Sequence, residues 1–447
     1  MSHRDPLLEI DTVWIIVTGI LVMFMQAGFA CLEIGFSRGK NVGTVVAKIL
    51  INFSVASIVW WAFGFALGFG GGGELFGDSG FLLSIGHVLS AGSPIPGPLN
   101  AHGSAFAFFQ FVFCAVSLAV VWGTTLERIR FIAFPIYAVV FAGVIYPAVA
   151  HWIFGGGLLG DVGQGMQDFA GSTVVHLTGA TGGLAALLLL GPRRGKYGPD
   201  GRPRAIPGHS MPIFGLGVLI LWLGWFGFNP GSTLSAADGR FAEVVFVTNL
   251  AAAAGVVGAG ATVQAITGRL DVGMVGNGAI AALVAITAPS GYVEFWAAPI
   301  IGLVAGVLVV VSVLAIDRVL DDPVGALSAH GVAGVWGTLS CGLFASPRLV
   351  GGADVPGVPG LVYTGSFEQL GVQALGIAAT FVFVFGVSYV TFGAIKAVFG
   401  LRVSEEEERE GLDLAEHGMY GYPEQFVATS GAEGELEGLF ASPEPLQ

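Results

Sequence analysis

Two matched stretches of the sequence indicate how the chain folds: Asp168-Phe-Ala-Gly-Ser-Thr-Val-Val-His176 and Asp322-Pro-Val-Gly-Ala-Leu-Ser-Ala-His330. Each places a histidine eight residues after an aspartate, and glycines follow at helical spacing. At 1.5 Å per residue, eight residues of helix span about 12 Å. If each aspartate lies at a membrane surface, both histidines lie near the midplane of a hydrocarbon core about 30 Å thick.

Long apolar runs surround both stretches. The 447 residues are 54% hydrophobic and only 11% charged, whereas soluble domains carry about 25% charged residues. Runs such as 131–153 and 210–229 have the length of about 20 residues that crosses a membrane. The three cysteines stand apart in apolar segments, without metal-binding or disulfide spacing. The sequence therefore predicts a polytopic membrane protein with no metal or other cofactor.

The hydropathy predicts an all-α protein with eleven transmembrane helices. Their expected bounds are about 12–34, 43–69, 101–125, 131–153, 170–190, 210–229, 243–266, 272–288, 294–315, 324–345 and 369–399. Basic residues such as Arg128, Arg193 and Lys396 gather on one side of these spans. The positive-inside rule then places the N-terminus outside and the C-terminus in the cytoplasm. The net charge of −13 comes largely from the tail and the outer loops, so no nucleic-acid partner is expected.

The two histidine stretches enter the membrane from opposite sides, on the fifth and tenth spans. This is the pattern of an inverted five-helix repeat, in which the substrate path lies at the repeat interface near the midplane. We therefore expect a transmembrane domain over 1–399, followed by a cytoplasmic tail over 400–447. The domain would contain repeat one (about 10–191), repeat two (about 209–345) and a last helix (about 369–399).

The tail differs from the spans in composition. Ser404 and Glu407 have the spacing of a capping box at the start of a short helix. From Ala428 onward Gly, Glu, Ser and Pro dominate, so this end of the tail is expected to be disordered.

A single intramembrane histidine is as readily a core residue bonded to a helix carbonyl as a functional group. Two histidines in matched inverted positions favour function, and we assign His176 and His330 to a pore. A neutral imidazole both donates and accepts a hydrogen bond, which suits a small polar or proton-exchanging solute. His102, His151 and His209 lie near span ends and are expected to be structural.

Several segments resemble motifs of the Amt/Mep/Rh ammonium transporter family, in its Amt branch. Beyond the two histidine stretches, these segments are Gly224-Trp-Phe-Gly-Phe-Asn229-Pro-Gly-Ser232, His330-Gly-Val-Ala-Gly334, Met25-Gln-Ala-Gly-Phe-Ala-Cys-Leu-Glu33, Ser37-Arg-Gly-Lys-Asn41, Glu127-Arg-Ile-Arg130 and Gly400-Leu-Arg-Val-Ser-Glu-Glu-Glu-Glu-Arg-Glu-Gly-Leu-Asp413. The match is collinear over about residues 10 to 422.

The resemblance implies a homotrimer in the cell membrane with a separate pore in each protomer. It implies an outer recruitment site for ammonium that includes Ser232 and Phe109, with Asp168 supporting the outer vestibule. Below it, Phe113 and Phe228 would form a constriction, and Trp225 would border the pore that His176 and His330 line. The tail resembles the segment that couples the subunits and binds PII-type nitrogen regulators.

Each of these residues also has a purely structural interpretation. Without the motifs, we would interpret Phe109, Phe113 and Phe228 as core or lipid-facing residues. Trp225 would be a packing residue or an anchor at the membrane interface. Ser232 is equally well a helix cap, and the N-cap of the fifth span is the favoured role of Asp168.

Phe154, in His151-Trp-Ile-Phe154, departs from the pattern of the resembling family, which usually has a recruitment-site tryptophan here. Phenylalanine keeps an aromatic face but loses the indole N–H and gives a weaker cation–π contact. Trp152 is not expected to replace it, because two residues turn a helix by about 200°.

The resemblance favours an ammonium transporter that recruits NH4+, removes its proton and conducts NH3, with the proton moving separately. The first alternative is an ammonium sensor that transports little; the expected lack of an output domain after the tail argues against it, and such a sensor would have to signal through a partner protein. A membrane-embedded enzyme is disfavoured because neither histidine has a third ligand nearby in the sequence. Passage of another small gas, as in the Rh branch, is a further alternative.

Overall fold

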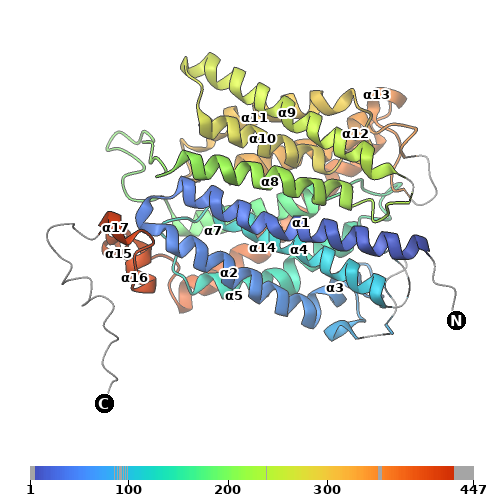
Figure 1. Cartoon of the computed structure of the whole chain (residues 1–447), viewed down its shortest axis with the longest axis horizontal. Helices are drawn as coiled ribbons and strands as arrows, with labels where there is room; N and C mark the ends of the chain where they lie inside the picture. Colours follow the sequence, from blue (N-terminus) through green and yellow to red (C-terminus); the bar gives the residue numbers. More distant parts are fainter. Residues whose placement is uncertain are drawn as a thin grey trace.

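A computed structural model describes residues 6–84, 99–237, 239–350 and 355–426, with residues 86, 87, 89, 93, 95 and 97 of one loop. Within this part of the chain the architecture is helical, and no strand forms. The membrane-domain elements are α1 (Pro6–Phe36), η1 (Gly39–Asn41), α2 (Val42–Val59), η2 (Trp60–Gly64), α3 (Phe65–Phe69), η3 (Phe81–Leu83), α4 (Ala101–Gly123), α5 (Ala133–Val140), η4 (Phe141–Ile145), α6 (Tyr146–Ile153), η5 (Ser172–Leu177), α7 (Thr178–Leu190), α8 (Met211–Gly231), α9 (Arg240–Thr267), α10 (Val272–Thr287), α11 (Ala297–Ile316), η6 (Leu327–Val332), α12 (Ala333–Phe344), α13 (Leu361–Thr364) and α14 (Glu368–Val398). They run side by side as one bundle (Figure 1).

The helices bear out the predicted all-α membrane architecture. Among the described residues, nine helical segments are long and apolar enough to cross a membrane. α10 is a shorter apolar helix, and η6 with α12 forms a helical segment at the place of the expected tenth span. The total of eleven spans and the orientation of the termini stay predictions.

Close packing between the two halves of the chain depends on glycine. The most extensive helix pair is α1 with α8, the first helix of each expected repeat. A Cβ atom at Gly217 of α8 would lie 2.5 Å from the backbone nitrogen of Leu32 on α1, so a larger residue would push the helices apart. Between helices in a membrane, such small residues allow the van der Waals contact that drives association.

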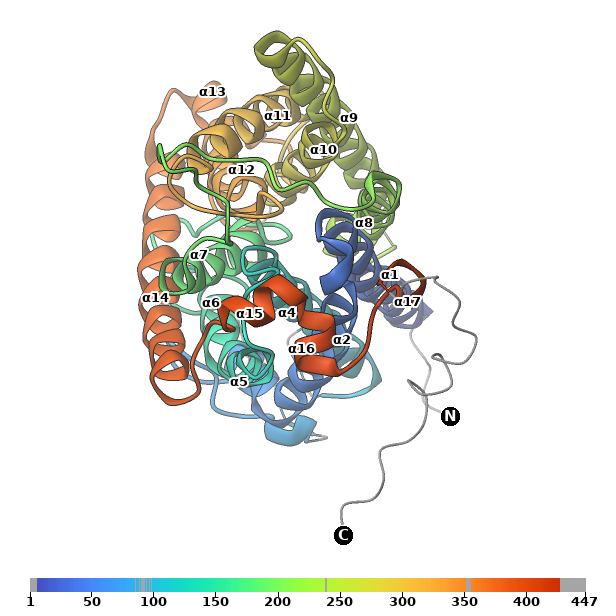
Figure 2. The same ribbon diagram turned by 90° about the vertical axis from the view of Figure 1, so that its left-hand side faces the viewer.

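The tail helices α15 (Glu405–Glu410), α16 (Leu412–His417) and α17 (Pro423–Phe426) lie across one end of the bundle (Figure 2). We call this the tail end, and α1 begins at the opposite, far end (Figure 1). The predicted capping box of Ser404 and Glu407 is confirmed at the start of α15. Asp413 on α16 caps α2, because its carboxylate accepts hydrogen bonds from the backbone N–H groups of Gly43 and Thr44, both at 2.8 Å. The predicted disorder from Ala428 onward lies outside the described residues.

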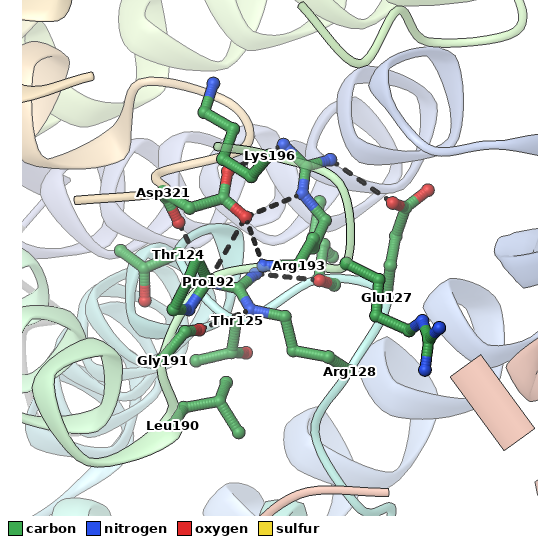
Figure 3. Close-up of polar contacts among 12 residues, drawn as sticks. Thr124, Thr125, Glu127, Arg128, Leu190, Gly191, Pro192, Arg193, Lys196 and Asp321 are labelled. Atoms are coloured by element: carbon green, nitrogen blue, oxygen red, sulfur yellow. Dashed lines mark hydrogen bonds and ion pairs between the residues drawn. The ribbon is translucent and has the colours of Figure 1, made fainter. Parts of the chain in front are cut away.

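A buried charge cluster links three loops at the tail end, namely those after α4, after α7 and before η6 (Figure 3). The guanidinium of Arg193 contacts the carboxylates of Asp321, at 2.8 Å, and Glu127, at 3.2 Å. Arg128 donates to the backbone carbonyl of Asp321 at 2.8 Å. Burial opposes ionisation of Asp321, but the hydrogen bonds and charge of Arg193, with Arg128, outweigh it and lower its pKa to about 2. The cluster therefore fixes the segment that leads into η6.

Candidate functional site

The two histidines assigned to a pore from the sequence lie on matched π-helical turns, His176 on η5 and His330 on η6. A π turn inserts an extra residue into a helix and is frequently found at functional sites. Asp168 caps η5: its two carboxylate oxygens accept hydrogen bonds from the four consecutive N–H groups of residues 171–174, at 2.8–3.0 Å. Asp322 plays the same part at η6, where it accepts from the N–H of Leu327 at 2.7 Å. An aspartate that caps a π turn and precedes its histidine by eight residues therefore occurs twice in the chain.

The histidines meet in the interior of the bundle. Their Nδ1 atoms lie 3.2 Å apart, and the ring centroids are 5.2 Å apart. Both rings are buried, and Nε2 of His176 has no hydrogen-bond partner among the described residues. Two neutral imidazoles at this distance share one hydrogen, so one Nδ1 donates while the other accepts. The arrangement differs from the structural interpretation, in which a histidine bonds a helix carbonyl.

Aromatic side chains enclose His176 on the side toward the far end. Its ring stacks on Trp225, with centroids 5.3 Å apart, and on Phe228, at 5.5 Å. Trp225 is held in place by a 2.9 Å hydrogen bond from its indole Nε1 to the hydroxyl of Thr287. Phe228 in turn stacks on Phe113 at 4.0 Å. These two phenylalanine rings are in van der Waals contact, so passage between them requires the rings to separate.

A pocket of about 290 Å³ lies beyond this phenylalanine pair; we call it the aromatic pocket. Its lining residues are Phe109, Gln110, Phe113, Phe154, Phe169, Ser232 and Leu234. The Ser232 hydroxyl donates to the carbonyl of Phe228 at 2.8 Å, which leaves the oxygen lone pairs as acceptors. Such a pocket offers a cation aromatic faces and one hydrogen-bond acceptor.

Phe154 and Ser232 therefore lie in the same pocket, whereas Asp168 does not line it. Both carboxylate oxygens of Asp168 are taken up by the η5 cap. Trp152 does not line the pocket either, because its indole Nε1 donates to the carbonyl of Leu75 at 3.1 Å.

On the other side of the histidines, a largely apolar cavity leads toward the tail end. Besides His330 it is lined by residues such as Phe29, Leu32, Leu221 and Val324. Asn277 and Val324 also line a vestibule of about 1040 Å³, so they join the two spaces. Aromatic pocket, phenylalanine pair, histidine pair, apolar cavity and vestibule thus follow one another along the bundle.

Several residues along this path were not predicted from the sequence. Gln110 and Phe169 line the aromatic pocket, Asn277 stands where cavity meets vestibule, and Thr287 positions Trp225. Gln110 and Phe169 directly follow two assigned residues, Phe109 and Asp168, which is a weak signal. Asn277 and Thr287 stand in the expected eighth span with no pattern that would single them out.

The remaining histidines at span ends bind local groups. His102 contacts the Thr12 hydroxyl at 2.8 Å, and His151 contacts the backbone carbonyls of Gly68 and Gly73. His209 contacts the carbonyl of Ser37 at 2.9 Å. These contacts agree with the structural roles expected for them. In the described part of the chain, no group of three or more His, Cys, Asp or Glu side chains is placed to hold a metal ion.

Comparison with known proteins identifies the family. The model of the Ammonium Transporter Family matches residues 13–422. The chain is 44% identical to ammonium transporter Amt2 of Archaeoglobus fulgidus, over 95% of this chain and 91% of that protein. It is 36% identical to an ammonium transporter of Bacillus subtilis, over 92% of this chain and 98% of that protein.

Solved structures give the same result. A structure titled Sensor Amt Protein superimposes with a TM-score of 0.83 at 35% identity, covering 92% of this chain and 99% of that one. Mep2 of Candida albicans superimposes with a TM-score of 0.79 at 29% identity, covering 92% of this chain and 90% of that one. The protein is a multi-pass membrane protein, and its chain belongs to the Ammonium Transporter Family.

Proposed function

We propose that the protein transports ammonium by binding NH4+ in the aromatic pocket, removing its proton near the phenylalanine pair and conducting NH3 past the two histidines. The observation that carries this proposal is the alignment of three features. The aromatic pocket lies on the far-end side of the stacked Phe113 and Phe228, and the ring of His176 stacks on Phe228. In this family context, the order suits a cation that is first bound and then deprotonated.

Recruitment follows from the chemistry of the aromatic pocket. Each aromatic face attracts a cation by about 0.5–2 kcal/mol, and more when the cation is desolvated. The Ser232 oxygen accepts an N–H hydrogen bond from NH4+. Phe154 supplies a ring face without the indole N–H of tryptophan, so this pocket is expected to bind ammonium more weakly than one with tryptophan.

Deprotonation follows from the dry path beyond the phenylalanine pair. A charge in an apolar membrane interior is costly, so the path disfavours intact NH4+ and admits NH3. The proton released by NH4+ is accepted by an imidazole nitrogen of the histidine pair and leaves separately. K+ has no proton to release and is excluded.

The assembly belongs to the same proposal. We place eleven spans in the cell membrane, with the far end outside and the tail end in the cytoplasm, and with lipid around a homotrimer. The tail helices on α2 would then be accessible to a PII-family regulatory protein. The proposal includes no cofactor, catalytic reaction or nucleic-acid partner.

A second candidate function is ammonium sensing with little transport, in which the chain signals through a partner protein. Two observations favour sensing over an enzyme or a channel for a different gas. One is the similarity to the structure titled Sensor Amt Protein. The other is Phe154 in the aromatic pocket.

Currents on solid-supported membranes test the proposal. Purified protein in liposomes is pulsed with ammonium and with potassium, and wild type is compared with His176→Ala and His330→Ala. We expect an ammonium-specific current in wild type that is lost or altered in both variants. Absence of current despite ammonium binding would contradict proton-coupled transport and favour sensing or electroneutral passage of NH3.

A further inference from the structure

A buried ion pair stands beside the path from the aromatic pocket to the vestibule, and the proposed function gives it no role. Glu33 of α1 and Lys48 of α2 contact each other through carboxylate and amine, and each side chain is only 2% exposed. Both residues lie inside expected spans. Charged groups within a membrane are costly, and they mark functional paths more often than packing. The pair therefore calls for a functional explanation.

Buried polar groups surround this pair. A small cavity is lined by Glu33, Lys48, Gln26, Asn52 and Trp122, among others. Both side-chain polar atoms of Asn52, Nε2 of Gln26 and Nε1 of Trp122 are buried and have no hydrogen-bond partner within the described ranges of the chain. Buried polar groups are nearly always satisfied by protein or by ordered water, so a cavity with such walls suits water.

This polar cavity shares lining residues with one neighbouring cavity on each side. Glu33 and Ala119 also line the apolar cavity that His330 faces. At the other end, Lys48 also lines a third cavity, whose walls include Asn41, Glu127 and Leu412. The N–H of Leu412 on α16 donates to the Asn41 side chain at 2.9 Å, so this third cavity lies beneath the tail. Three small cavities with shared walls therefore lie in sequence between His330 and the tail end, along α1, α2 and α4.

We propose that Glu33 and Lys48 form a proton-conducting branch that leaves the pore at His330 and ends beneath α16, separate from the route of NH3 through the vestibule. The proposal rests on the proposed function, because the branch carries the proton that NH4+ releases. A proton reaching the Glu33 carboxylate forms the carboxylic acid, and the Lys48 ammonium then loses one proton toward the third cavity. Transfer of the Glu33 proton to the Lys48 amine restores the ion pair, so one proton enters and one leaves.

The competing explanation is that the ion pair only stabilises the contact between α1 and α2. A structural pair would affect folding, current and ammonia passage together. A proton branch would affect current while ammonia still passes. The two explanations are therefore separated by measuring charge movement and ammonia movement in the same liposomes.

Glu33→Gln keeps the size of the side chain and a hydrogen bond to Lys48 but removes the proton-accepting carboxylate. Current is measured on solid-supported membranes. Ammonia entry is measured as alkalinisation of a pH dye inside the liposomes, after subtraction of protein-free liposomes. We expect the ammonium current to fall at least tenfold and the alkalinisation to rise above that of wild type, because NH3 that enters without its proton takes up a proton inside the liposome.

Glu294→Gln is the matched control, because Glu294 pairs with Arg348 at the far end of the bundle and should leave both signals unchanged. Asn52→Leu is a second variant, which keeps both charges and makes the wall of the polar cavity apolar. Asn52→Leu should also lower the current without lowering ammonia entry. It tests the proton branch if Glu33→Gln does not fold.

Unchanged current in folded Glu33→Gln would overturn the branch and leave the proposed function intact. Loss of current without a rise in alkalinisation would mean that NH3 passage is lost as well, which would assign the pair a structural role and overturn the branch. A wild-type protein that gives alkalinisation without current, or neither signal, would overturn the proposed proton movement itself and the branch with it.

Discussion

His176 and His330 hold their Nδ1 atoms 3.2 Å apart, although 154 residues separate them in the chain. The contact follows from two π turns that enter from opposite ends of the bundle, each capped by the aspartate eight residues earlier. One shared hydrogen forces the two neutral rings into complementary roles, one donating and one accepting. A proton added to one ring can therefore be passed to the other without a large movement of either side chain.

The first prediction concerns this exchange. His176→Gln keeps a neutral side chain that donates and accepts hydrogen bonds, but an amide does not take up a proton near neutral pH. We expect the ammonium current to fall at least tenfold and no potassium current to appear. Solid-supported membrane recordings check this, with His209→Gln as the matched control outside the pore. Retention of the full current would show that the imidazole of His176 carries no proton.

The second prediction concerns Phe154 in the aromatic pocket. Phe154→Trp adds an indole ring with a stronger cation–π contact to the lining of this pocket. A gain of about 0.5–1 kcal/mol corresponds to a two- to fivefold lower half-saturating ammonium concentration. The concentration dependence of the current measures it, with Trp152→Phe as a control for ring changes outside the pocket. An unchanged half-saturation value would mean that Phe154 does not contact the recruited cation.

The third prediction concerns acid stability at the tail end. An unfolded aspartate has a pKa of about 3.9, and Arg193 holds that of Asp321 at about 2 in the fold. Because the folded pKa is the lower one, the stabilisation is present above about pH 4 and is lost as pH falls from about 4 to about 2. A shift of about two units corresponds to about 2–3 kcal/mol.

Asp321→Asn should therefore lower the thermal unfolding temperature at pH 7 and flatten its decline below pH 4. Tryptophan fluorescence of the detergent-solubilised protein between pH 7 and pH 3 measures both effects. Asp200→Asn, at an exposed ion pair with Arg202, is the control and should behave as wild type. An acid decline as steep in Asp321→Asn as in wild type would contradict the prediction.

The fourth prediction concerns the contact between tail and bundle. Asp413 accepts hydrogen bonds from the N–H groups of Gly43 and Thr44 at the start of α2. Asp413→Ala removes this cap, which costs about 1–2 kcal/mol, and should free the tail. Limited proteolysis should then cleave the tail faster than in wild type, while the exposed-site variant Glu406→Ala should not change the rate. Equal cleavage rates would show that other contacts hold the tail.

Much of the membrane architecture could be predicted from the sequence, because hydropathy is a local property of the chain. The expected spans coincide with helical segments, and the matched Asp-to-His spacing identified the two stretches that form η5 and η6. The capping box at Ser404 was also readable, since it depends on residues three apart. Glu33 and Lys48 stand within expected spans, but nothing in the sequence indicates that their side chains meet.

Only the tertiary structure decided which side chains share a cavity. Asp168 faces the N–H groups of η5 and not the aromatic pocket, whereas Phe169 and Gln110 line that pocket. It also set Glu33 between the cavity of His330 and that of Lys48. The sequence by itself determined where the helices form, because that depends on neighbouring residues. The faces that these helices turn toward one another depend on packing between residues far apart in the chain, which no local pattern records.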